Sequence, residues 1–153
     1  MSFLGIMLVA CKGGKDVPTN KPPVKDPFRE TFHEAILEKM KNNYDVAAGL
    51  FEKCLGMKPE NDAVHYALSD VYEELGDHQK SLQYALSAYE LDKENKWYQI
   101  RVGDLYFDKG DYHNAAEYYA LSIEDEKNID VKFRYAESLI FSNQFKKAIE
   151  VLD

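Results

Sequence analysis

Apolar and small residues recur at helical spacing along the chain from residue 28 onward. The segment from Tyr44 to Met57 shows the pattern most simply, because its apolar positions fall at i, i+3, i+4, i+7 and i+8. These positions are Ala47, Leu50, Phe51, Cys54 and Leu55. No run shows the strict alternation of apolar and polar residues that indicates a strand. The pattern therefore predicts an all-α chain of short amphipathic helices.

Short polar turns interrupt the helical pattern at a nearly constant interval of 34, 34 and 33 residues. The turns are Asn42-Asn43-Tyr44, Gly76-Asp77-His78, Gly110-Asp111-Tyr112 and Asn143-Gln144-Phe145. Gly and Asn tolerate the left-handed conformation that ends a helix, and Asp commonly caps the start of the next one. A small residue lies three positions past each turn, namely Ala47, Ser81, Ala115 and Ala148. A fixed period in this range predicts an array of helix-turn-helix repeats.

The residues around each turn resemble those of the tetratricopeptide repeat. A small residue and a Tyr lie on the first helix (Ser69 and Tyr72, then Gly103 and Tyr106), and small residues line the second helix. The first unit departs from the pattern, because Glu38 replaces the Tyr. The resemblance covers residues 28–153, as units 28–61, 62–95, 96–128 and an incomplete 129–153. It implies a right-handed superhelical array, an α-solenoid, whose first helices line a concave groove that binds a peptide or a partner helix.

One stripe of each first helix, at offsets i, i+4 and i+7, is predicted to be free of packing and to face this groove. The candidate partner-binding residues are Tyr66, Asp70, Glu73, Trp97, Ile100, Asp104, Phe107, Phe133 and Glu137. Phe32, Ile36, Lys39 and Ile140 complete the stripe in the first and fourth units, and Asp108 lies beside it. An alternative interpretation is that the acids belong to an ordinary solvated helix face.

The chemistry of the stripe indicates the kind of partner. Repeats of this family that clamp the C-terminal carboxylates of heat-shock chaperones present Lys, Arg and Asn on the same surface. Acidic residues here would repel a carboxylate, so the stripe favours a protein or peptide with Lys or Arg between apolar residues. Tyr66, Trp97 and Phe107 are the expected anchors, because aromatic residues dominate binding hot spots.

The N-terminus is predicted to be a signal peptide, residues 1–10, followed by a lipid anchor. Leu8-Val9-Ala10-Cys11 resembles the lipobox of bacterial lipoproteins, which implies cleavage before Cys11 and lipidation of its thiol. The Lys or Arg that usually precedes the apolar run is missing. Residues 11–27 are rich in Gly, Pro and charge, which predicts a flexible tether. An ordinary exposed Cys after a hydrophobic N-terminus is the alternative.

Composition narrows the function classes. The net charge of −8 argues against a nucleic-acid partner, because there is no basic patch to release counterions. The two cysteines and four histidines show no metal-ligand spacing, and no phosphate-binding loop or nucleophile motif occurs, so neither a cofactor nor an enzyme is expected. The chain stops inside the second helix of the fourth unit, which predicts a longer protein.

Together these features predict a lipid-anchored scaffold that binds proteins in the bacterial envelope. Lys12 follows the Cys, rather than the Asp that would resemble an inner-membrane retention signal of enteric bacteria. This favours the outer membrane, facing the periplasm. The alternatives are the N-terminal part of a larger lipoprotein that binds a glycan or another small molecule, and a regulatory array attached to a further C-terminal domain.

Overall fold

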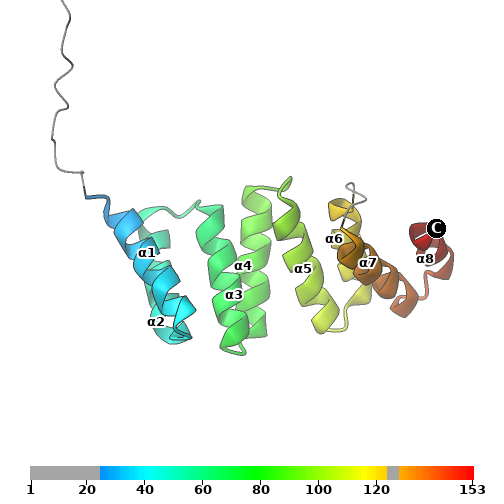
Figure 1. Cartoon of the computed structure of the whole chain (residues 1–153), viewed down its shortest axis with the longest axis horizontal. Coiled ribbons are helices and arrows are strands. Elements are labelled where there is room, and N and C mark those ends of the chain that lie inside the picture. Colours follow the sequence, from blue (N-terminus) through cyan, green and yellow to red (C-terminus); the bar gives the residue numbers. More distant parts are fainter. Residues whose placement is uncertain (1–24, 124–127) are drawn as a thin grey trace, which may run out of the picture.

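The computed structural model describes residues 25–123 and 128–153, and these residues form eight helices (Figure 1). The helices are α1 (Pro27–Met40), α2 (Tyr44–Met57), α3 (Asp62–Glu74), α4 (His78–Leu91), α5 (Lys96–Asp108), α6 (Tyr112–Ser122), α7 (Ile129–Phe141) and α8 (Phe145–Leu152). No strand occurs within these two ranges. The all-α prediction is therefore confirmed.

The helices follow one another in an elongated row, which begins with α1 and α2 and ends with α8 (Figure 1). The most extensive contacts lie within the pairs α1–α2, α3–α4 and α5–α6, and each second helix also contacts the next first helix. Each pair is one helix-turn-helix unit. The core is accordingly a series of local clusters, as expected of a repeat protein.

The turns have the conformations that their residues predict. Gly76 and Gly110 adopt φ values of 75° and 80°, and Asn42 and Asn143 both have a φ of 62°. Asp77 caps the following helix, because its carboxylate accepts a hydrogen bond of 3.0 Å from the Lys80 amide. These local signals fix where each unit bends.

Replacing Gly110 by alanine should lower the free energy of unfolding by about 1 kcal/mol, because an L residue in the left-handed region strains the backbone. A Cβ at this position would meet no atom within 4 Å, so backbone strain is the sole cost. Thermal or urea unfolding followed by circular dichroism would measure the change. Asn143→Gly is the matched control and should be neutral or slightly stabilising. Equal stability of Gly110→Ala and the wild type would contradict the explanation.

Small buried residues allow the helices of a unit to approach one another. Ala47, Ser81 and Ala115 are fully buried, and so is Cys54, a small residue of the core. Gly103 is the extreme case, since a Cβ built on it would lie 2.8 Å from the Tyr119 ring. The ring of Tyr119 therefore fills the space that the missing side chain leaves.

Two tyrosine pairs repeat at the same positions of successive units. Tyr72 stacks on Tyr84 with ring centroids 5.5 Å apart, and Tyr106 stacks on Tyr118 with centroids 5.7 Å apart. Each pair joins the first helix of a unit to its second helix. These rings fill the space between helices that small residues bring together.

Two sequence predictions concern the ends of the chain. The signal peptide, the lipobox around Cys11 and most of the tether lie outside the described residues, which begin at Lys25. Among the helices that the structure describes, none is long and apolar enough to cross a membrane. At the other end, α8 exposes 62% of Ile149 and 55% of Phe145.

Candidate functional site

The predicted partner-binding stripe lies on the first helices, α1, α3, α5 and α7. Its aromatic members differ in exposure: Trp97 is 68% exposed and Phe133 is 56% exposed, whereas Tyr66 and Phe107 are half-buried. Tyr66 lies against Tyr98 of the next unit, with ring centroids 5.3 Å apart. Trp97 and Phe133 are therefore the aromatic candidates most accessible to a partner.

The expectation that the stripe is free of packing is wrong for several apolar members. Ile100 and Phe107 pack against the buried cluster around Tyr119, and Phe32 and Ile36 pack against the cluster of the first two units. The reason is that first helices pack against the second helix of their own unit and against that of the preceding unit, and long side chains also bridge neighbouring first helices. These residues contribute to stability whether or not a partner also contacts them.

The carboxylate of Asp70 is already paired within the chain. Lys39 Nζ lies 2.7 Å from one oxygen, and Arg101 Nε lies 3.5 Å from the other. Arg101 also donates hydrogen bonds to the Ser69 hydroxyl at 3.0 Å and to the Ser69 carbonyl oxygen at 3.1 Å. Asp70 thus joins α1, α3 and α5, which corrects the assumption that its charge is free to attract a basic partner.

Asp104 forms the corresponding link between α5 and α7. Its carboxylate accepts a hydrogen bond of 2.6 Å from the Tyr119 hydroxyl and lies 3.4 Å from Arg134 Nη1. Burial, followed by the hydrogen bond to Asp104, raises the pKa of Tyr119. Glu137, another acid of the stripe, is exposed and has no ion-pair partner among the described residues. The stripe is therefore less acidic than its composition suggests.

A hollow of about 640 Å³ lies where α5 and α7 begin. Trp97 and Ile100 line one side, and Ile129 and Asp130 line the other. Ile129 is 62% exposed, so an indole ring and an aliphatic side chain are both open to solvent here. This arrangement suits an apolar side chain of a partner, because burying it would remove apolar surface of both molecules from water.

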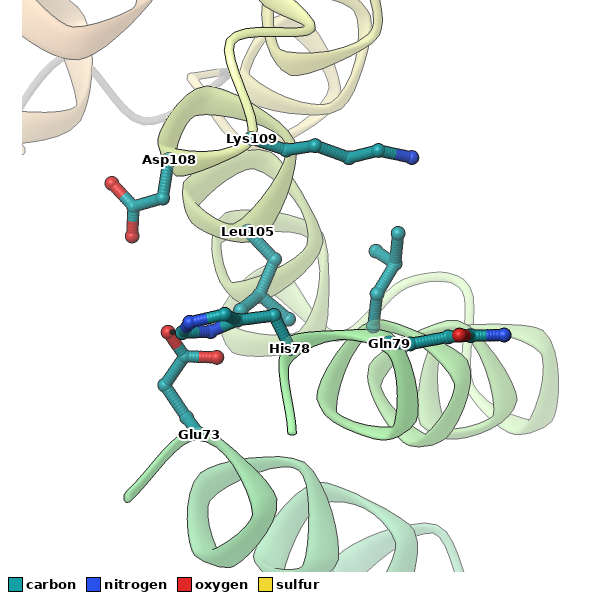
Figure 2. A pocket seen from close by; sticks show the side chains of 7 residues that line it. Glu73, His78, Gln79, Leu105, Asp108 and Lys109 are labelled. Carbon is teal, nitrogen blue, oxygen red and sulfur yellow. Dashed lines mark hydrogen bonds and ion pairs between the residues drawn. The ribbon is translucent and has the colours of Figure 1, made fainter. Parts of the chain in front are cut away.

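A second hollow, of about 470 Å³, was not identified from the sequence, although the stripe includes one of its residues (Figure 2). It lies where α3 ends, α4 begins and α5 ends. Its lining residues are Glu73, His78, Gln79, Leu82, Leu105, Asp108 and Lys109. Helical periodicity could not reveal it, because the residues come from three helices and from different positions within the repeat.

Within residues 25–123 and 128–153, no group of three or more His, Cys, Asp or Glu side chains is placed to hold a metal ion. Burial raises the pKa of the Cys54 thiol, which disfavours the reactive thiolate. The exposed features of the first helices are those of a binding surface.

Two family models match the chain, and both are described as tetratricopeptide repeat. The first matches residues 34–96 and the second matches residues 98–124. The matched segments contain α2, α3, α4 and α6 in full and all of α5 except Trp97.

Solved structures share the arrangement of helices at low sequence identity. A structure of MamA AMB-1 is 17% identical with a TM-score of 0.74, and the match covers 82% of this chain and 69% of that one. YrrB, a tetratricopeptide-repeat protein with an unusual peptide-binding site, is 23% identical with a TM-score of 0.71 and coverages of 83% and 66%. The first such domain of Spaghetti (RPAP3), bound to the HSP90 peptide SRMEEVD, is 16% identical with a TM-score of 0.64 and coverages of 82% and 92%. At these identities the similarity shows the fold.

Proposed function

Since the chain belongs to the tetratricopeptide repeat family, we propose that it is a protein-interaction scaffold, which binds a peptide or protein along its first helices. The observation that carries the proposal is that Trp97 is 68% exposed. It lines the same hollow as Ile129, which is also exposed. Large apolar residues grouped on a surface are typical of interaction sites. Relatives of the same fold bind peptides, as YrrB and Spaghetti do, which supports a partner of this class.

The proposed partner carries basic residues between apolar ones. The peptide bound by Spaghetti, SRMEEVD, has three acidic residues. On this chain Glu73, Asp108 and Glu137 remain near or on the stripe without a Lys or Arg partner within ion-pair distance among the described residues. These charges suit a cationic segment, and screening by salt should weaken its binding.

The proposal places this scaffold on the bacterial envelope through Cys11. The support is in the sequence: Leu8-Val9-Ala10-Cys11 has the order of a lipobox, and a Gly- and Pro-rich segment separates it from α1. A lipoprotein with more than one acyl chain would stay attached to its membrane. Attachment to the outer membrane, facing the periplasm, is the location proposed.

Photo-crosslinking in bacterial cells tests both parts of the proposal. A photoreactive amino acid is placed at Trp97 or Tyr66, and crosslinked proteins are identified by mass spectrometry. Gln83, which is exposed on the second helix α4, serves as the control position. We expect one recurrent envelope protein from Trp97 and Tyr66, little from Gln83, and a marked loss in a Cys11→Ala variant.

The outcomes separate the two parts. The same crosslinks from Gln83 would mean that the first helices do not define the binding surface. If the Cys11→Ala variant crosslinks and fractionates with membranes as the wild type does, the proposed lipid anchor is contradicted, and the proposed scaffold function is unaffected. The absence of crosslinks from both stripe positions in a folded, correctly located protein would contradict the scaffold itself.

A further inference from the structure

The hollow between the second and third units combines an apolar wall with two carboxylates. Leu82 and Leu105 form the wall. Figure 2 shows the side chains of Glu73, His78 and Asp108 on one side of the hollow, whereas Lys109 points to the other side. Its volume of about 470 Å³ is within the range of roughly 300–1,000 Å³ that is common for ligand pockets.

The corresponding junction between the third and fourth units is aromatic rather than polar. Counting one repeat onward from Glu73, His78 and Asp108 leads to Phe107, Tyr112 and Phe141. These three rings contact one another, with centroids between 4.7 and 6.1 Å apart. Three aromatic rings therefore occupy the positions that are polar at the preceding junction.

The junction between the first and second units has its own cation. One repeat back from Glu73, His78 and Asp108 are Lys39, Tyr44 and Glu74. Lys39 spans the junction, and its ammonium lies 2.7 Å from Asp70. Lys39, Tyr44 and Glu74 also line a hollow, of about 370 Å³, but the ammonium of Lys39 supplies a cation there. At the junction between the second and third units, Glu73 replaces this lysine, so the hollow has a carboxylate at the same position.

The carboxylates of this hollow have few partners. Glu73 Oε1 lies 3.1 Å from His78 Nδ1, but Glu73 Oε2 is buried and has no hydrogen-bond partner among the described residues. Asp108 is exposed, and no ion pair or hydrogen bond to its carboxylate occurs within the described ranges. A buried acceptor oxygen without a donor is unfavourable, and a donor from a ligand would relieve it.

We propose that this hollow, defined by Glu73, His78, Leu82, Leu105 and Asp108, is a binding site for a lysine or arginine side chain of the partner. The aliphatic part of that side chain would lie against the two leucines, and its cationic group would donate hydrogen bonds to the two carboxylates. The site takes from outside what Lys39 supplies at the first junction. This inference rests on the proposed scaffold function and specifies which partner residue is recognised.

The site can be tested without the partner by nuclear magnetic resonance of the full chain with labelled leucine methyl groups. The probes are N-acetyl-arginine amide, N-acetyl-lysine amide and N-acetyl-norleucine amide, the last having a similar stem without a charge. We expect saturable shifts of the Leu82 and Leu105 methyl signals with the two cationic probes and much smaller shifts with the neutral one.

Variants assign the effect to the carboxylates. In Glu73→Gln/Asp108→Asn, binding of the cationic probes should weaken by about tenfold or more, since charge-assisted hydrogen bonds are lost. Glu34→Gln/Glu94→Gln removes the same charge from exposed positions elsewhere and should bind as the wild type does. Circular dichroism verifies that both double variants are folded.

Three results would overturn the inference. Equal leucine shifts with the norleucine probe would mean that the hollow is merely apolar. Unchanged binding in Glu73→Gln/Asp108→Asn would exclude the carboxylates, and no shift at tens of millimolar probe would exclude the site. Crosslinking from Trp97 that persists in this double variant would leave the scaffold function standing without this site, so the two proposals fail separately.

Discussion

Replacing Tyr119 by alanine should lower the free energy of unfolding by about 3–5 kcal/mol, the range for removing a large aromatic ring from a core. Tyr119 is fully buried and packs in one cluster with Ala115 of its own helix and Val131 of α7. Its ring also lies against Gly103, which has no side chain to fill the resulting space. The substitution therefore leaves a cavity that the surrounding helices cannot close by a simple rotamer change.

The loss should extend beyond the third unit. Tyr119 contributes both to the packing of its own unit and to the contact with α7, and repeat proteins depend on such contacts between neighbours. Urea unfolding followed by circular dichroism measures the total, and hydrogen exchange of α7 amides measures the local part. We expect faster exchange in α7 of Tyr119→Ala, with the first two units much less affected.

Tyr119→Phe is the matched control, because it keeps the ring and removes the hydroxyl. The hydroxyl donates a hydrogen bond of 2.6 Å to Asp104, which retains Arg134 as a second partner. The expected loss is about 1 kcal/mol. If Tyr119→Phe were as destabilising as Tyr119→Ala, the hydrogen bond rather than the packing of the ring would be the main contribution.

The fold could be predicted because its determinants are local and repeated. Gly76 and Gly110 end helices through their own backbone freedom, and Asp77 caps α4 by accepting a hydrogen bond from the amide three residues ahead. The small residues three positions past each turn are buried for the same reason in each unit. Signals of this kind recur at one interval, so the pattern itself reveals them.

The binding surface could be predicted only in part, because its charges pair between units at a different interval. Asp70 pairs with Arg101, 31 positions later, and Asp104 pairs with Arg134, 30 positions later. Neither interval equals the repeat length, so aligning the units does not place these partners opposite each other. The acids of the stripe appeared free for this reason, whereas two of them stabilise the array.

The hollow at the second junction could be recognised only by comparing three junctions in space. Glu73, His78 and Asp108 are ordinary surface residues for a helical pattern. Their significance comes from the rings at the equivalent positions of the next junction and from the lysine that bridges the previous one. A sequence alignment of the units would show these substitutions. It would not show that the substituted side chains line one hollow, because they belong to three separate helices.

Replacing Arg101 by alanine should lower the free energy of unfolding by about 2–3 kcal/mol, although it lies on the surface that carries the stripe. Its side chain is 18% exposed and bonds both the hydroxyl and the carbonyl oxygen of Ser69, in addition to lying 3.5 Å from Asp70. Removing it would leave a half-buried carboxylate with Lys39 alone. The penalty for unpaired groups in this position exceeds the strength of an ordinary surface ion pair.

Arg134→Ala is the matched comparison, because Arg134 pairs with Asp104 in the same way but is 47% exposed. Solvent screens this pair, so the expected loss is below about 1 kcal/mol and should shrink further at high salt. Arg101→Lys should fall between the two arginine-to-alanine variants, since an ammonium retains the charge and cannot reach both oxygens of Ser69 in the same forked geometry. Urea unfolding at low and high salt measures all three variants.

Equal, salt-sensitive losses in Arg101→Ala and Arg134→Ala would mean that both arginines act only as surface charges. A large, salt-independent loss for Arg101→Ala alone would mean that its links from α5 to α3 hold the second and third units together. In that case, the surface proposed to bind a partner is also one that stabilises the array.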